Sequence, residues 1–304
     1  MQDGIKIGVV GGDGRMLLAA RCLSERYECA VWGLDGEGGD LPAGAVRCAD
    51  PVSAVRGASA VLLPLPVSRD GIRLYAPLAD HAPELIPLIR EAEPGGILLG
   101  GKIPPGTVEA ARERGIRACD YFEDEAVQIG NAVPTAEGAL AACIEALPVT
   151  VSGMRAAILG YGRVGRTLAQ RMIALGAKVT AAARSPKDLA WAEADGCEPV
   201  PLAAFLASPP WCAALFNTIP AARTLGRETL SKMPRETVIF ELASDGGGVD
   251  AEAAAECGIR LVPLPSLPGK TAPETAGEIV CRAVCRRIRE FFGTPECEEG
   301  RGRE

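Results

Sequence analysis

The sequence predicts an α/β protein with two doubly wound, Rossmann-like domains and a cleft between them. Three observations support this fold class. The chain has 304 residues, enough for two domains of about 150 residues each. Short apolar segments alternate with helical segments, which is typical of a parallel sheet covered by helices. In each half, the first apolar segment runs into a glycine-rich turn that opens a helix.

In the first half, residues 5–10 predict a strand, Gly11–Gly14 a glycine turn, and residues 15–25 a helix. Further buried strands are expected at 29–33, 60–63 and 96–99, separated by short helical segments such as 108–114. A helical stretch at about 135–147 ends this half. We expect residues 1–150 to form a substrate-side α/β domain.

The second half repeats this pattern. Residues 155–159 predict a strand, Gly160–Gly165 a glycine turn, and 166–175 a helix. Later strands are expected at 178–183, 213–217, 237–241 and 260–263, and a last helix at 274–292. We therefore expect a second Rossmann domain at 151–275. Residues 276–304 are expected to supply a helix that returns toward the first domain, and a frayed tail.

Composition excludes several classes of protein. The net charge is −7, which argues against a nucleic-acid binder. No apolar run reaches the ~18 residues that a membrane span needs, and no signal peptide is evident at the N-terminus. The 11 cysteines form no Cys-x-x-Cys pair and the chain has one histidine, so we expect buried thiols rather than a metal site.

The strongest motif is Gly-x-Gly-x-x-Gly between a predicted strand and a predicted helix. It comprises Gly160, Tyr161, Gly162, Arg163, Val164 and Gly165. The first glycine allows a tight turn, the second lets a pyrophosphate approach the backbone, and the third lets the helix pack on the strand. The helix N-terminus offers N–H groups and partial positive charge to the phosphates. The motif predicts dinucleotide binding.

The segment after the next strand indicates which dinucleotide binds. NAD sites usually have Asp or Glu at the end of this strand, where it binds the ribose 2′-hydroxyl. Here the segment carries Arg184, Ser185 and Lys187, and the first carboxylate is Asp188. An Arg fork pairs with a 2′-phosphate, and the hydroxyl and the Lys add a donor and charge. We therefore predict that the Rossmann domain at 151–275 binds NADP.

The glycines of the first turn, Gly11, Gly12 and Gly14, do not have the Gly-x-Gly-x-x-Gly spacing. Asp13 would also place negative charge near a phosphate. We interpret the turn as a substrate-side loop in which Arg15 faces an anion. The alternative is a surface Arg on an ordinary α/β turn.

Several sequence blocks together resemble the family of A subunits of dipicolinate synthase from spore-forming bacteria, over about residues 5–292. The blocks are VVGGDGR (9–15), LPVS (65–68), NAVPTAEG (131–138), LGYGRVG (159–165), NTIP (217–220) and LPGKTAPETAG (267–277). The resemblance implies NADP-dependent oxidation of dihydrodipicolinate to pyridine-2,6-dicarboxylate during sporulation. It also implies a partner, the flavoprotein-like B subunit, and a cytoplasmic location in the mother cell.

Two substrate carboxylates call for cationic or hydroxyl donors at strand ends and helix starts. The expected substrate-binding residues are Arg15, Ser68, Asn131, Thr135 and Lys270. Lys102 and Glu137 are the catalytic candidates, and His81 is a weaker one. Glu137 acts as a base if desolvation raises its pKa; alternatively it is an acid in a first helical turn, favoured by the helix dipole.

On the cofactor side, segments that follow buried strands are expected to border the nicotinamide half. They comprise Asn217, Thr218, Ile219 and Pro220 after one strand, and Glu241, Leu242, Ala243 and Ser244 at the end of the next. Pro268 and Gly269 resemble the loop that closes over the nicotinamide in other two-domain dehydrogenases. The alternative for each segment is an ordinary βα turn.

Two other functions remain open from the sequence. One is a reductase like shikimate dehydrogenase or methylenetetrahydrofolate dehydrogenase, although no convincing Lys–Asp pair of the first class is present. The other is a non-catalytic NADP-binding protein that serves as a scaffold for its partner. The oligomeric state is not indicated.

Overall fold

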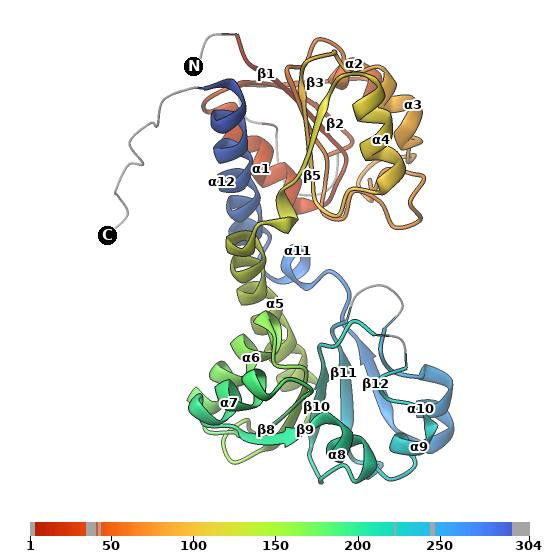
Figure 1. Cartoon of the computed structure of the whole chain (residues 1–304), viewed down its shortest axis with the longest axis vertical. Helices are drawn as coiled ribbons and strands as arrows, with labels where there is room; N and C mark the ends of the chain where they lie inside the picture. The colour runs from red at the N-terminus through yellow and green to blue at the C-terminus, as the bar shows by residue number, and fades with distance from the viewer. Residues whose placement is uncertain (1–3, 35–40, 42–43, 222, 244–246, 294–304) are drawn as a thin grey trace. The chain divides into compact units, whose positions relative to one another are not determined.

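The computed structural model describes residues 4–34, 41, 44–221, 223–243 and 247–293, which form two six-stranded parallel sheets (Figure 1). The strand orders are β3-β2-β1-β4-β5-β6 and β12-β11-β10-β7-β8-β9. Both follow the doubly wound order, in which the first strand lies between the second and the fourth. The predicted pair of Rossmann-like domains is therefore confirmed.

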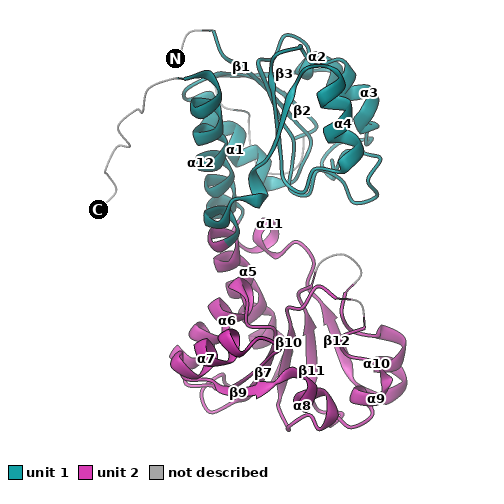
Figure 2. Cartoon of the chain, in the orientation of Figure 1, with its two compact units in different colours: residues 1–128, 273–304 teal, residues 129–272 magenta. Residues whose placement is uncertain are grey.

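The chain divides into two compact units, shown in different colours in Figure 2. Unit 1 comprises residues 1–128 and 273–304, and unit 2 comprises residues 129–272. The sequence placed the boundaries at 150 and 275, whereas the first division of the structure falls inside a long helix.

Unit 1 contains the first sheet and the helices that cover it. Its elements are β1 (Lys6–Val10), α1 (Gly14–Ser24), β2 (Glu28–Trp32), β3 (Ala45–Arg47), α2 (Pro51–Val55), β4 (Ala60–Leu62), α3 (Leu85–Arg90), β5 (Ile97–Gly100), α4 (Pro105–Glu113), β6 (Arg117–Asp120), the 3₁₀ turn η1 (Tyr121–Glu123), the start of α5 (Glu125–Ala146) and α12 (Pro273–Phe292).

Unit 2 contains the rest of α5 and the second sheet. Its other elements are β7 (Arg155–Leu159), α6 (Arg163–Ala174), β8 (Lys178–Ala183), α7 (Pro186–Ala194), β9 (Glu198–Pro201), α8 (Leu202–Ala207), β10 (Ala214–Asn217), α9 (Arg227–Leu230), β11 (Val238–Glu241), α10 (Ala251–Cys257), β12 (Arg260–Pro263) and α11 (Leu267–Thr271).

Helix α5 begins at Glu125, ten residues before the start expected at Thr135. Proline is common in the first turn of a helix, but Pro134 lies inside α5. The helix continues because Ala132, Ala136 and Ala139 are buried at helical spacing. Glu137 therefore lies deep inside α5, so its interpretation as a first-turn acid is wrong.

Helix α12 packs along α1 in unit 1 (Figure 1). A Cβ at Gly277 would lie 2.7 Å from Leu18 Cβ and 2.8 Å from the Arg15 carbonyl oxygen, so only glycine permits this approach. Apolar side chains of α12, such as Val284 and Ile288, complete the core on one face of the first sheet. The C-terminal helix is thus part of the core of unit 1.

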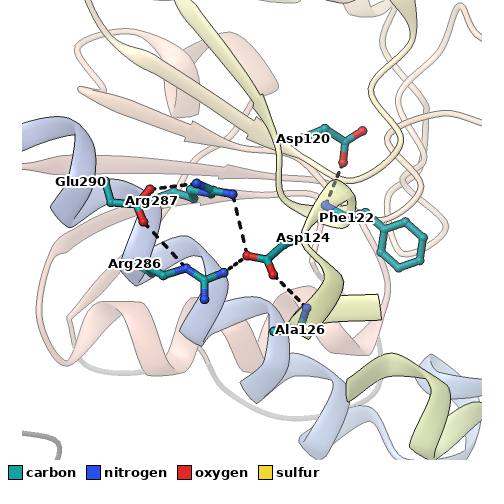
Figure 3. Close-up of polar contacts among 7 residues, drawn as sticks. All are labelled: Asp120, Phe122, Asp124, Ala126, Arg286, Arg287 and Glu290. Atoms are coloured by element: carbon teal, nitrogen blue, oxygen red, sulfur yellow. Dashed lines mark hydrogen bonds and ion pairs between the residues drawn. The ribbon is translucent and has the colours of Figure 1, made fainter. Parts of the chain in front are cut away.

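Ion pairs fix α12 to the start of α5 (Figure 3). The carboxylate of Asp124 accepts a hydrogen bond from the Ala126 N–H at 2.9 Å and another from Arg286. Arg287 lies 3.8 Å from the same carboxylate and pairs with Glu290 at 2.9 Å. Asp124 therefore caps one helix and anchors another.

Within the residues that the structure describes, no helix combines the length and apolar character needed to cross a membrane. The same residues contain no group of three or more His, Cys, Asp or Glu side chains placed to hold a metal ion.

Candidate active site

The glycine turn of unit 2 joins β7 to α6 at the point where the sheet order reverses. Gly160 has a φ of 89°, which favours glycine. A Cβ at Gly165 would lie 2.1 Å from the Gly160 carbonyl oxygen, so α6 can approach the turn only because this residue is glycine. A Cβ at Gly162, in contrast, would meet no described atom within 4 Å. The packing of the chain does not require the second glycine, which leaves space at the helix N-terminus.

The N-terminus of α6 is suited to an anion. Gly162 is its N-cap residue and provides no side chain to accept the first-turn N–H groups. These donors and the positive end of the helix dipole point to a negatively charged ligand. The turn therefore fits the pyrophosphate of a dinucleotide, and a Cβ at Gly162 would project into the open space beside the turn.

The side chain of Tyr161 is buried beside α7 and does not extend into this space. Its hydroxyl donates to Asp195 Oδ2 at 3.0 Å and lies 3.5 Å from Cys197 Sγ. Burial raises the pKa of the Tyr161 phenol. Arg166 pairs with Asp195 at 2.6 Å and lowers the pKa of that carboxyl. Only the backbone of Tyr161 can therefore face a ligand at the turn.

The segment after β8 carries polar groups without partners in the described structure. Arg184 and Lys187 are exposed and make no hydrogen bond or ion pair with any residue that the structure describes. Ser185 is the N-cap residue of α7 but makes no side-chain capping bond. Strand β8 ends without a carboxylate. These groups provide an Arg fork, a hydroxyl and a Lys, the donors that a 2′-phosphate requires.

The ends of β10 and β11 are held together by Glu241, a buried acid whose hydrogen bonds the sequence did not indicate. Glu241 accepts hydrogen bonds from Asn217 Nδ2 at 2.9 and 3.1 Å. It also accepts from the N–H groups of Ala243, Gly248 and Val249 at 2.9–3.0 Å. One carboxylate thus fixes the end of β10 and the segment after β11. The signal in the sequence was an acid that ends an apolar strand.

Thr218 and Ile219 support the glycine turn from β10. The Thr218 hydroxyl donates to the Leu159 carbonyl at 2.9 Å, and Ile219 lies against Gly160. Pro220 is exposed, and Ala243 is half-buried. Ser244 lies outside the described residues.

Pro268 and Gly269 lie in the short helix α11 rather than in a loop. Leu267 and Thr271 of this helix pack against Gly138 of α5, and Pro268 is buried. Lys270 is exposed on the same helix.

The corresponding turn of unit 1 is filled by the chain itself. The Gly12 N–H donates to the Tyr75 carbonyl at 2.9 Å, and a Cβ at Gly11 would lie 2.8 Å from Leu74. Asp13 caps α1 by accepting from the Arg15 N–H. This helix N-terminus therefore already has a carboxylate, and the loop before α3 covers the glycine turn. Among the described residues, the two units share a topology, but the open turn belongs to unit 2.

Arg15 is buried, with 6% of its surface exposed. Its Nε and Nη2 donate to the two Asp13 carboxylate oxygens at 2.8 Å, and Nη2 also donates to the Leu65 carbonyl at 2.6 Å. Burial opposes the charged form, but Asp13 outweighs it and raises the pKa of Arg15. The surface-Arg alternative is therefore wrong, and Arg15 forms an ion pair with Asp13.

Ser68 and Lys102 follow the carboxyl ends of β4 and β5. The Ser68 hydroxyl donates to Asp70 at 3.0 Å and accepts from the Gly71 N–H at 2.9 Å. Lys102 is exposed and has a φ of 55°, a strained conformation for a residue with a side chain.

The remaining candidates lie on α5 in unit 2. The Thr135 hydroxyl donates to the Asn131 carbonyl at 2.7 Å, so its proton is used in a hydrogen bond within α5. The side chain of Glu137 is 52% exposed and pairs with Arg171 of α6 at 3.1 Å. Glu137 thus lacks the desolvation on which its role as a base depended.

The fold and the open glycine turn, together with the family match of residues 135–257, define the class of this protein: an oxidoreductase with a nicotinamide dinucleotide-binding domain. Residues 6–122 match the family model of the N-terminal domain of the dipicolinate synthase A subunit. Residues 135–257 match the D-isomer specific 2-hydroxyacid dehydrogenase, NAD binding domain.

Similar proteins narrow the class to one family. The dipicolinate synthase A subunit of Bacillus subtilis (strain 168) is 30% identical over 303 residues, which cover 99% of this chain and all of that protein. The crystal structure of dipicolinate synthase, A chain, from Bacillus subtilis has a TM-score of 0.83 at 29% identity, covering 96% of this chain and 98% of that one. The chain belongs to the family of dipicolinate synthase A subunits.

Other solved structures agree. The dipicolinate synthase A subunit of Bacillus halodurans has a TM-score of 0.84 at 28% identity, covering 95% of this chain and 99% of that one. A transhydrogenase from Sinorhizobium meliloti, at 17% identity and a TM-score of 0.67, covers 94% of this chain and 95% of that one. This last likeness concerns the fold alone.

Proposed function

We propose that this chain oxidises dihydrodipicolinate to dipicolinate with NADP as the hydride acceptor. The proposal includes a partner, the flavoprotein-like B subunit, and a role in the mother-cell cytoplasm during sporulation. The observation that carries it is the 30% identity with the A subunit of a dipicolinate synthase over 99% of this chain. The name of that relative, a subunit of a synthase, supports a partner.

In this proposal, unit 2 binds the cofactor. The turn Gly160–Gly165 holds the pyrophosphate, and Arg184, Ser185 and Lys187 bind the 2′-phosphate. The segments that border the nicotinamide half comprise Asn217, Thr218, Ile219, Pro220, Ala243, Ser244, Pro268 and Gly269. Glu241 holds Asn217 and Ala243 in place, because both donate hydrogen bonds to its carboxylate. NADP supplies a two-electron hydride acceptor.

Unit 1 binds the substrate in this proposal. The dihydropyridine ring loses one hydride and one proton, which restores an aromatic ring and supplies driving force. The protein therefore mainly orients the ring and accepts a proton. Ser68 and Lys102 are the unit 1 residues assigned to this task, and Asn131, Thr135 and Lys270 remain further candidates. Arg15 acts indirectly, because its hydrogen bond to Leu65 holds the segment that leads to Ser68.

The test mixes the purified chain with NADP and freshly generated dihydrodipicolinate, with and without the partner, and follows NADPH and dipicolinate by absorbance. Matched appearance of both products with the chain alone supports the whole assignment. Products only with the partner place part of the site, or its assembly, on the B subunit. Neither product in either mixture, with NADP binding intact, contradicts the proposed substrate.

A further inference from the structure

Backbone hydrogen bonds join three loop segments at the carboxyl end of the first sheet. The Val67 N–H donates to the Gly101 carbonyl at 2.9 Å, and the Tyr75 N–H donates to the Val67 carbonyl at 2.8 Å. Ser68 and Lys102 directly follow Val67 and Gly101 in the chain. Side chains from these segments therefore start from neighbouring backbone positions at this edge of the sheet.

One of these segments carries a preformed pair of side chains. The Arg69 guanidinium lies 4.4 Å from the centre of the Tyr75 ring, and Arg69 Nη2 donates to the Tyr75 hydroxyl at 3.1 Å. Arg69 is exposed and Tyr75 is half-buried. Stacking holds the planar fork of the guanidinium, so less conformational entropy is lost when a ligand binds it.

A tight turn fixes the backbone around Arg69. The carboxylate of Asp70 accepts from the Ser68 hydroxyl at 3.0 Å and from the N–H groups of Ile72 and Arg73 at 2.9 and 2.8 Å. These bonds lower the pKa of Asp70 to about 2, so the carboxylate stays charged at neutral pH. The turn thus holds Arg69 next to Tyr75 on a backbone that is anchored on both sides.

We propose that Arg69 and Tyr75, with Lys102 on the neighbouring segment, form a carboxylate-binding site in unit 1 that holds a carboxylate of the pyridine dicarboxylate. This inference rests on the proposed function and adds two residues to it. An Arg fork matches the two oxygens of a carboxylate, and the phenol supplies a further hydroxyl donor. Lys102 adds the charge that a second carboxylate needs.

Two observations favour this place for the substrate. Arg69, Tyr75 and Lys102 fall within residues 6–122, which match the N-terminal domain of the dipicolinate synthase A subunit, whereas residues 135–257 match a domain of 2-hydroxyacid dehydrogenases. The chain as a whole has a net charge of −7, so a doubly negative substrate needs a local group of cations.

The test uses the full chain and pyridine-2,6-dicarboxylate as the probe, with binding measured by titration calorimetry. NADP binding and the melting temperature are measured on the same samples. Arg69→Gln should weaken dicarboxylate binding about tenfold or more, because a charge-assisted hydrogen bond is lost. Tyr75→Phe keeps the ring but removes the hydroxyl, and it should weaken dicarboxylate binding about threefold to tenfold. Arg69→Lys keeps the charge without the fork and should fall between Arg69→Gln and the wild type.

Arg73→Gln is the matched control, because Arg73 is an exposed arginine of the same loop. It should bind the dicarboxylate as the wild type does, and NADP binding and melting should not change in any variant. In turnover, Arg69→Gln should raise KM more than it lowers kcat.

The possible failures are distinguishable. A wild-type chain that binds NADP but neither binds nor forms the dicarboxylate overturns the proposed function. A wild type that binds the dicarboxylate, with Arg69→Gln and Tyr75→Phe binding it equally well, overturns only the assignment of these residues. An equal loss in Arg73→Gln would also overturn it, because charge alone would then explain the effect.

Discussion

The amide of Asn217 donates to both carboxylate oxygens of Glu241, at 2.9 and 3.1 Å, where two neighbouring strands of the second sheet end. The same carboxylate accepts backbone N–H groups from the segment after β11. Because so many N–H donors surround the Glu241 carboxylate, replacing one of its acceptor oxygens by a donor is unfavourable. The hydrogen bonds to Glu241 should therefore contribute to both the stability of unit 2 and cofactor binding.

Replacing Glu241 by Gln should lower the free energy of unfolding by about 1–3 kcal/mol, because an amide NH₂ would face N–H donors in a buried place. NADP affinity should fall as well, since the segment after β11 loses its anchor. Urea denaturation and a fluorescence titration measure the two effects. Glu236→Gln, an exposed acid before β11, is the control and should resemble the wild type.

Two glycines in the turn of unit 2 should respond differently to replacement by alanine. Gly162→Ala should leave stability nearly unchanged, because no described atom lies near the new Cβ, but should weaken NADP binding about tenfold or more. Gly165→Ala should instead destabilise the fold by about 1–3 kcal/mol, because its Cβ meets the Gly160 carbonyl. Equal NADP affinity in wild type and Gly162→Ala would contradict pyrophosphate binding at this turn.

Cofactor preference depends on the segment after β8. The double change Arg184→Ala with Lys187→Ala should weaken NADP binding about tenfold to a hundredfold and leave NAD binding nearly unchanged. Lys178→Ala removes an exposed charge from the opposite end of the same strand and serves as the control. A wild-type chain that prefers NAD, or that binds NAD and NADP equally well, would contradict the predicted preference for NADP.

The buried pair of Arg15 and Asp13 should be important for folding rather than for NADP binding. Arg15→Met leaves the Asp13 carboxylate without its partner and should lower the free energy of unfolding by about 3–5 kcal/mol, which urea denaturation measures. NADP affinity of the folded fraction should remain that of the wild type. A variant that melts like the wild type but loses dicarboxylate binding would instead place Arg15 in direct contact with substrate.

The turn that carries Arg69 should respond to acid. The pKa of Asp70 is lowered to about 2 by the N–H groups of Arg73 and Ile72 and the Ser68 hydroxyl. Its stabilising contribution is therefore fully present above its unfolded pKa of about 4 and is lost as pH falls from about 4 toward about 2. Asp70→Asn should thus differ from the wild type by a constant amount above about pH 5 and by less below about pH 4. Urea melts across this range test it; a difference that grows as pH falls would contradict the sign.

The sequence predicted most of the fold because the informative features are local. Glycine turns and buried strands such as β7 and β10 lie in short contiguous segments. Strands β3, β6 and β9 were missed because they are short and contain exposed or half-buried residues, so no apolar run indicates them. Helix α5 is longer than predicted, because buried alanines on both sides of Pro134 extend the helix through a residue that usually interrupts one.

Features of the candidate site that depend on distant residues could not be predicted. Arg15 looked like a free cation, but its burial depends on Leu65, fifty positions away. Glu241 receives donors from another strand, and the Arg69–Tyr75 pair forms only when the loop folds back on itself. The glycine motif and the Arg184 segment, in contrast, are contiguous and were recognised from their order alone.

The return of the chain to unit 1 at Pro273 has a consequence for synthesis on the ribosome. Residues 129–272 form one continuous segment, so unit 2 can complete its contacts as soon as that segment has emerged. Unit 1 must wait, because α12 covers α1 and is translated after unit 2. The N-terminal unit is therefore expected to finish folding second, against the usual order in which the domain made first folds first. A nascent chain stalled before residue 273 would leave the apolar face of α1 uncovered and dependent on chaperones.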